Sequence, residues 1–135
     1  MSGKSANRKV LVLDDEEAIA DTLAVILRTR GYAIKVAYSA ETAIEIISDW
    51  TPDVAIVDVM LPLMNGIDFS IVLKSNHPDC KVVLFSGQPD TSTLLAEAAR
   101  HGHYFDILAK PLHPAFILDK VESLLTANQR PLTDA

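Results

Sequence analysis

The chain has 135 residues, of which 49% are hydrophobic and 22% charged, and its formal net charge is −6. This length suits one domain with a core of its own. The acidic balance argues against direct binding of nucleic acid or of an anionic membrane, because both require a basic face. No apolar stretch is long enough to span a membrane, and the apolar run near the start is too short for a signal peptide. The single cysteine, Cys80, cannot form an internal disulfide, which favours a cytoplasmic location.

The two ends of the chain are polar and differ in composition from the part between them. We expect residues 1–8 to be a disordered leader and residues 127–135 to be a polar tail or the start of a linker. Residues 9–126 then form one domain.

Short apolar runs alternate with amphipathic segments along that domain. The first run, Val10–Leu13, predicts a buried strand, and a helix follows in which apolar residues recur at helical spacing until Gly31. A second strand is expected at Ala33–Ala37, and Ser39 is a suitable N-cap for the next helix. Val54–Val57 is apolar at every position, which is typical of a parallel strand covered on both faces.

The second half of the domain continues the same alternation. A helix is expected over about residues 65–75, with Phe69, Val72 and Leu73 facing inward, and a fourth strand over 81–85. The helix expected over about residues 91–100 is rich in alanine and has few large anchors, so we expect it to pack loosely. A fifth strand, 106–109, and a last helix beginning near Pro114 complete the pattern.

Five strands alternating with five helices predict an α/β fold in which helices cover both faces of a parallel sheet. Periodicity does not give the strand order. Among the common doubly wound orders, 2-1-3-4-5 suits five strands, and it makes strands one and three neighbours at the point where the winding reverses.

Polar residues stand where four of these strands end. Asp14-Asp15 follow strand one, Asp58 ends strand three, Ser86 ends strand four and Lys110 follows strand five. In this order the three carboxylates converge and repel one another, and a hard divalent cation such as Mg²⁺ would relieve the repulsion. A hydroxyl and an ammonium group complete a site for an anion beside Asp58. Metal and lysine charges are most of what phosphoryl transfer requires.

This set of residues resembles the receiver domain of two-component response regulators, a flavodoxin-like fold. The match lies in the acidic pair Asp14-Asp15, in Asp58 within VDVMLPLMNG, in Ser86-Gly87 and in Lys110-Pro111, and it covers about residues 8–126. Each piece alone is weak, but all four in this order at strand ends are highly specific.

The resemblance implies a role for each matching residue. Asp58 would be the phosphoacceptor, and Ser86 and Lys110 would bind phosphoryl oxygens. Mg²⁺ would be held by Asp15, Asp58 and the backbone carbonyl of Met60, and by Asp14 through water. Lys110-Pro111 would be a cis peptide.

The resemblance also implies partners. The phosphoryl donor would be a phosphohistidine on a sensor histidine kinase or a histidine phosphotransfer protein, and the signal would pass to an output partner or effector domain that the sequence does not identify. The chain would catalyse only its own phosphorylation and dephosphorylation.

Two other functions stay open. A phosphatase-type enzyme that forms an aspartyl phosphate would need a second Asp two residues after Asp58, where this chain has Met60. An inactive interaction domain would not need the complete set of acids, hydroxyl and lysine.

One position departs from the family pattern. Ile107 occupies the position, three residues before Lys110, where the family usually carries Tyr or Phe. The usual transmission of the signal through that ring is therefore in question.

Overall fold

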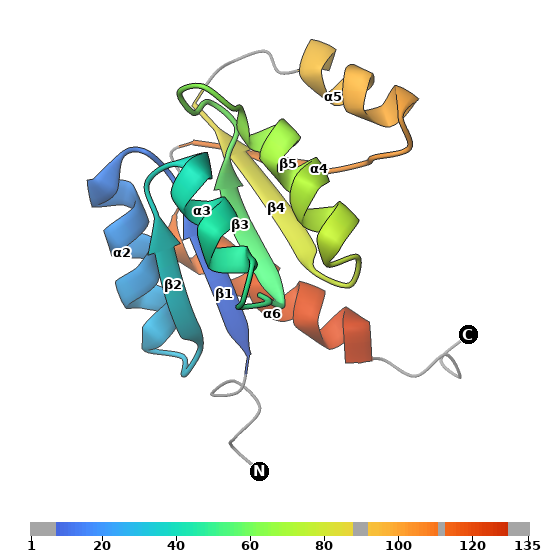
Figure 1. Cartoon of the computed structure of the whole chain (residues 1–135). Helices are drawn as coiled ribbons and strands as arrows, with labels where there is room; N and C mark the ends of the chain where they lie inside the picture. The colour runs from blue at the N-terminus through green and yellow to red at the C-terminus, as the bar shows by residue number, and fades with distance from the viewer. Residues whose placement is uncertain (1–7, 88–91, 111–112, 130–135) are drawn as a thin grey trace.

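The computed structural model describes residues 8–87, 92–110 and 113–129. Its five strands form one parallel sheet in the order β2-β1-β3-β4-β5 (Figure 1). Both the doubly wound α/β fold and the expected strand order are confirmed. The strands are β1 (Lys9–Leu13), β2 (Ala33–Ala37), β3 (Val54–Asp58), β4 (Lys81–Ser86) and β5 (Asp106–Ala109).

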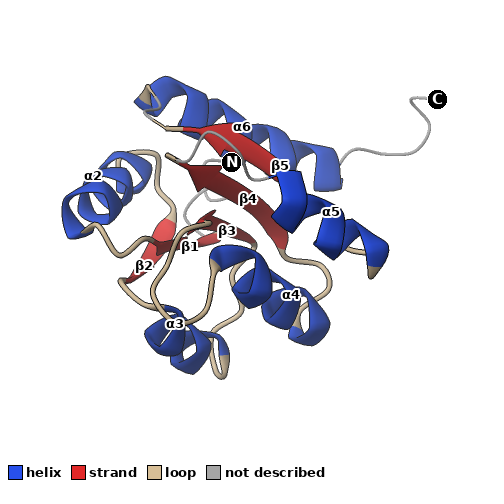
Figure 2. Cartoon of the chain, turned by 90° about the horizontal axis from the view of Figure 1, so that it is seen from above, coloured by secondary structure: helices blue, strands red, loops and turns tan. Residues whose placement is uncertain are grey.

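Five helices cover the sheet in two layers (Figure 2). On one face lie α2 (Glu17–Arg28) and α6 (Pro114–Gln129), and on the other lie α3 (Ala40–Ile47), α4 (Gly66–Asn76) and α5 (Ser92–Arg100). The predicted N-cap is confirmed, because the side chain of Ser39 accepts a backbone N–H in the first turn of α3. Asn65 caps α4 in the same way.

Alternation along the strands divides the core between the two helix layers. On β1, Val10 and Val12 pack toward α2 and α6, whereas Leu11 and Leu13 pack toward α3 and α4. All five residues of β3 are buried, as expected for the central strand of a covered parallel sheet. This rigid centre carries Asp58 at its end.

The helices on the second face differ in how firmly they are packed. In α4, Ile67, Phe69 and Leu73 are all buried, whereas Val72 is only partly buried because it lies beside the inward stripe of the helix. In α5, Ala98 is the one buried residue among the described side chains. This difference agrees with the loose packing that we expect for the alanine-rich helix α5.

The expected domain bounds, residues 9 and 126, stay a prediction. β1 begins at Lys9, and α6 continues to Gln129, three residues beyond the expected end of the domain at residue 126. A last helical turn needs no apolar anchor once the helix is formed. Residues 1–7 and 130–135 lie outside the described residues. Among the described helices, none is long and apolar enough to cross a membrane.

Candidate functional site

The polar residues predicted from the sequence meet at the carboxyl end of the sheet, where the arrowheads point in Figure 1. Asp14 follows β1, and its N–H donates to the carbonyl of Ala37 at 3.1 Å, which fixes it beside the end of β2. Asp58 is the last residue of β3 and Ser86 the last residue of β4. The N–H of Lys110 donates to the carbonyl of Ser86 at 2.8 Å, which extends the pairing of β5 by one residue.

The ammonium group of Lys110 is the centre of this site. Its Nζ lies 3.0 Å from Asp14 Oδ2, 3.2 Å from Glu16 Oε1 and 3.4 Å from Asp58 Oδ2. The same Nζ lies 4.7 Å from the centre of the Phe85 ring, close enough for a cation–π contact. One lysine thus faces three carboxylates across the ends of β1, β3 and β5.

Burial makes the charges at this site strongly interdependent. Asp14 is fully buried and Asp58 is 3% exposed. The pKa of Asp58 is raised to about 7, because burial and then the negative charge of Asp14 raise it by more than the Lys110 charge lowers it. For Lys110, burial works to lower the pKa, but its hydrogen bond to Asp14 and the charge of Asp58 outweigh burial, and the net pKa is raised. Without a further cation, Asp58 therefore binds a proton readily near neutral pH.

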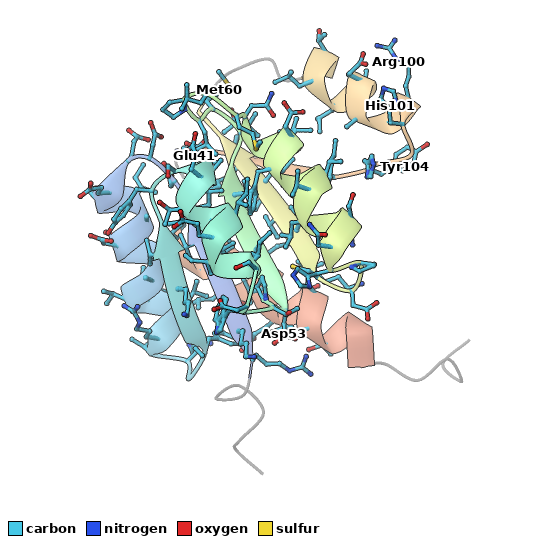
Figure 3. The ribbon with its side chains drawn as sticks, in the orientation of Figure 1. Glu41, Asp53, Met60, Arg100, His101 and Tyr104 are labelled. Carbon is cyan, nitrogen blue, oxygen red and sulfur yellow. The ribbon has the colours of Figure 1, made fainter. Side chains whose placement is uncertain are left out.

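The loop after Asp58 is held close to the strand end. The N–H of Met60 donates to Asp58 Oδ1 at 3.3 Å, and the N–H of Gly66 donates to the Val59 carbonyl at 2.8 Å. A Cβ atom on Gly66 would lie 2.0 Å from the Asp58 carbonyl oxygen, so only glycine permits this approach. Met60 is 46% exposed and marks this end of the molecule in Figure 3.

Ser86 lies in the middle of the predicted set. It ends β4, which stands between the strands of Asp58 and Lys110 in the sheet, and it is 4% exposed. Its register partner is Ala109, the residue just before Lys110. The hydroxyl is thus placed on the same edge as the acids and the ammonium group.

The acids at this edge fit a hard divalent cation. Asp14, Glu16 and Asp58 each offer a carboxylate oxygen, and these oxygens lie within 4.8 Å of one another. Oxygen ligands are what Mg²⁺ prefers, and a cation would relieve the repulsion that raises the pKa of Asp58. Asp15 is exposed and is not part of this group. Its direct ligation of Mg²⁺, like that through the Met60 carbonyl, stays a prediction.

Glu16 was not among the site residues predicted from the sequence. It is the third acid of the run Asp14-Asp15-Glu16-Glu17, and composition alone does not select one member of such a run. Its N–H donates to Asp14 Oδ1 at 2.9 Å, a local hydrogen bond of the kind that makes Asp a turn residue. The acidic run before an amphipathic helix indicates that acids lie at this edge of the sheet. Which of these acids contacts Lys110 depends on the bend of the backbone after β1.

The region where the chain departs from the family lies on β5. Ile107 is partly buried and packs against the same core as α3, α4 and α5. Of the nearby rings, Tyr104 is 80% exposed, whereas Phe105 is partly buried. The predicted cis peptide at Lys110-Pro111 involves a proline that lies outside the described residues.

Comparison with known proteins identifies the family. The model of the response regulator receiver domain matches residues 10–122, and the chain belongs to this family. It is 28% identical over 122 residues to the DNA-binding response regulator MtrA of Mycolicibacterium smegmatis, covering 90% of this chain and 52% of the relative. It is 32% identical to the probable transcriptional regulatory protein TcrX of Mycobacterium tuberculosis, covering 86% and 49%.

A solved structure shows the same fold. The CheY-like response regulator receiver domain protein of Methanospirillum hungatei superposes with a TM-score of 0.81 at 24% identity, covering 90% of this chain and 96% of that one. The chain is thus a receiver domain, a signalling domain of response regulators. It spans about half the length of the MtrA and TcrX relatives.

Proposed function

We propose that Asp58 accepts a phosphoryl group in a Mg²⁺-dependent reaction and that the domain then changes conformation to signal to an output partner. The observation that carries this proposal is a buried carboxylate at a strand end, 3.4 Å from a lysine ammonium group and beside a second buried acid. A buried acid with a strongly raised pKa and specific charged partners is typical of a functional site.

The proposed chemistry is a displacement at phosphorus. An oxygen of Asp58 forms the new P–O bond, and the bond from phosphorus to the donor nitrogen or oxygen breaks, its electron pair leaving with the donor. Lys110 and Ser86 bind phosphoryl oxygens. Both residues lie at the edge of the sheet that carries Asp58, and hydrogen-bond donors held close to developing charge stabilise it most effectively.

The residues proposed to hold Mg²⁺ are Asp15, Asp58 and the Met60 carbonyl, with Asp14 acting through water. The metal would neutralise charge on the phosphoryl oxygens. The support is the oxygen-rich, net negative surroundings of Asp58.

The proposed donor is a phosphohistidine on a sensor histidine kinase or a histidine phosphotransfer protein, and we place the domain in the cytoplasm, since its one cysteine requires no oxidising compartment. The MtrA relative is named as a DNA-binding response regulator, and this chain spans about half of that protein. We propose that any DNA binding belongs to an output domain, because the net charge of this chain is −6, which opposes binding to DNA.

We also propose that the domain turns over no separate substrate. A phosphatase-type enzyme of the aspartyl-phosphate class would require an acid at position 60, where an exposed methionine stands. An inactive interaction domain would not require two buried acids opposite a lysine, an arrangement that burial makes unfavourable unless the charges are paired.

The test is direct phosphorylation. The protein is incubated with Mg²⁺ and acetyl phosphate, and its intact mass is measured with time. We expect the mass to rise by one phosphoryl group in the parent and in Asp68→Asn, a control at an exposed acid in the first turn of α4. Asp58→Asn should show no rise. Equal labelling of Asp58→Asn would overturn the assignment.

A further inference from the structure

Glu16 contacts the central lysine and is not one of the proposed Mg²⁺ ligands. Its Oε1 lies 3.2 Å from Lys110 Nζ, and its side chain is 63% exposed, whereas the side chain of Lys110 is 13% exposed. The other two carboxylates that face this ammonium group are almost completely buried. Glu16 is therefore the solvent-facing member of the three.

Lys110 donates hydrogen bonds to Asp14 Oδ2 and Glu16 Oε1 and forms a longer ion pair with Asp58. An ammonium group has three N–H donors, and three carboxylates, those of Asp14, Glu16 and Asp58, lie within 3.4 Å of it. Phosphorylation of Asp58 would convert its carboxylate into an acyl phosphate, whose phosphoryl oxygens are further acceptors for this ammonium group. These oxygens would compete with Asp14 and Glu16 for its N–H donors.

Glu16 is the partner that can leave with the smallest loss. Separating the buried Asp14 from Lys110 would leave a desolvated carboxylate without its counter-charge, which is strongly unfavourable. The exposed Glu16 carboxylate regains water when it leaves, and exposed ion pairs contribute little. A phosphoryl group would also add negative charge close to Glu16 and repel it.

We propose, on the basis of the proposed phosphorylation of Asp58, that Glu16 is a positioning residue for Lys110. In the unphosphorylated protein Glu16 holds the ammonium group among the carboxylates. On phosphorylation it releases Lys110 to a phosphoryl oxygen. Glu16 thus restrains phosphorylation and favours the resting state.

The chain offers matched variants to test this role. Glu16→Gln removes the charge, and Glu16→Asp keeps the charge but shortens the side chain by one methylene, so that it no longer reaches Lys110. Glu17→Gln is the control, because Glu17 is an exposed acid at the next position. This substitution removes the same charge as Glu16→Gln does. The second-order rate constant for phosphorylation by acetyl phosphate is measured for each by intact mass.

We expect Glu16→Gln and Glu16→Asp to raise this rate constant by about two- to fivefold, the range that an exposed ion pair supports. Glu17→Gln should change it by less than about twofold. In the metal-free protein, NMR of the lysine side chains should show a shifted Lys110 signal in both Glu16 variants and an unchanged one in Glu17→Gln. This second readout does not depend on activity.

Three results would overturn the inference. If Glu16→Asp matches the parent and Glu16→Gln matches Glu17→Gln, only charge matters and Glu16 does not position Lys110. If Glu16→Gln slows phosphorylation and weakens Mg²⁺ binding, Glu16 is a metal ligand instead. If the parent gains no phosphoryl mass, the proposed function fails and this inference fails with it, which the parent measurement alone reveals.

Discussion

The two ends of the same sheet use charged residues in opposite ways. At the amino end, which Asp53 marks in Figure 3, Oδ2 of Asp53 accepts the Lys9 N–H at 2.8 Å, and the Asp53 N–H donates to the Lys9 carbonyl at 2.7 Å. Nearby, Lys74 donates from Nζ to the carbonyls of Pro78 and Cys80 at 2.8 and 2.9 Å. These charged groups bind complementary backbone groups and fasten β1, β3 and the turn before β4.

At the carboxyl end, by contrast, three carboxylates face one ammonium group. Two of the three are buried, and the pKa of Asp58 is raised by that burial. The surplus of negative charge can be relieved by a proton, a metal ion or a conformational change. Charged residues at the amino end are thus satisfied by backbone groups, whereas at the carboxyl end buried acids share one ammonium group, and the proposed function rests on this difference.

We expect the largest difference between substitutions of Lys110, at the carboxyl end of the sheet, and of Lys74, at the amino end. Lys110→Met should lower the rate of phosphorylation by acetyl phosphate by about 100-fold, since it removes a preorganised donor for the phosphoryl group. Lys74→Met should leave that rate nearly unchanged and lower the free energy of unfolding by about 1–3 kcal/mol through its lost hydrogen bonds to two carbonyls. Rates by intact mass and urea denaturation measure both. The comparison fails if Lys74→Met slows phosphorylation as much as Lys110→Met.

The next effect concerns metal binding at the carboxyl end. Asp15→Ala should weaken Mg²⁺ binding by about tenfold or more, and Asp14→Ala by less, because losing a direct ligand removes more than losing a contact through water. Asp53→Ala, at the opposite end of the sheet, is the control and should bind Mg²⁺ as the parent does. Calorimetric titration measures all three. Equal affinity of Asp15→Ala and the parent would mean that Asp15 is not a ligand.

A smaller effect appears in the pH dependence of stability without metal. The pKa of Asp58 in the folded state is about 7, above its ordinary value of 3.8, so the folded protein binds the proton more tightly than the unfolded chain. The contribution of Asp58 to the free energy of unfolding should therefore be fully present below about pH 4 and be lost as pH rises to about 7. This carboxyl can contribute at most about 1.4 kcal/mol per pH unit.

Urea denaturation across this pH range tests the sign. Asp58→Asn should flatten the fall and be more stable than the parent above about pH 7, whereas Asp53→Asn should keep the slope. Saturating Mg²⁺ should also reduce the slope, because the metal binds the ionised carboxylate. If the stability of the parent relative to Asp58→Asn does not fall between these pH values, the electrostatic description of the site is contradicted.

The smallest expected effect concerns how a change at Asp58 spreads. The helix α5 has one buried residue among its described side chains, whereas α6 places Ile117, Val121 and Leu125 in the core. Ile107 cannot exchange a polar solvent contact for burial as a tyrosine can. Amide shifts on adding beryllofluoride, a phosphoryl mimic, should therefore be larger across residues 87–102 than across 114–125. The opposite order would mean that β5 carries the signal.

Much of the fold follows from the sequence because buried parallel strands leave a strong pattern. The all-apolar run of β3 ending in Asp58 predicts both a central strand and a residue at its rim. The strand order needed more than periodicity, since apolar runs do not say which strands are neighbours. The inward stripe of α4 was harder to predict, because Ile67 and Val72 are equally apolar and only packing decides between them.

The sequence predicts that several polar residues lie together at one edge of the sheet, but it does not predict the contacts among their side chains, and the roles of these residues stay predictions. Asp14, Asp58, Ser86 and Lys110 each end or follow a strand, and parallel strands bring such ends to one edge. The contact of Glu16 with Lys110 depends on a bend after β1 and on side-chain reach, neither of which leaves a pattern in a run of acids. The raised pKa of Asp58 likewise depends on burial, which the residue type does not reveal.

The most direct test of the contrast between the two ends is to locate the phosphoryl group chemically. The protein is phosphorylated with acetyl phosphate and Mg²⁺ and then treated with borohydride, which reduces an aspartyl phosphate to homoserine. Peptide mass spectrometry then identifies the converted residue. We predict conversion at Asp58 alone, with Asp14, Asp15 and Asp53 unchanged. Conversion at another aspartate, or none at Asp58, would contradict the assignment of the phosphoacceptor to the end of β3.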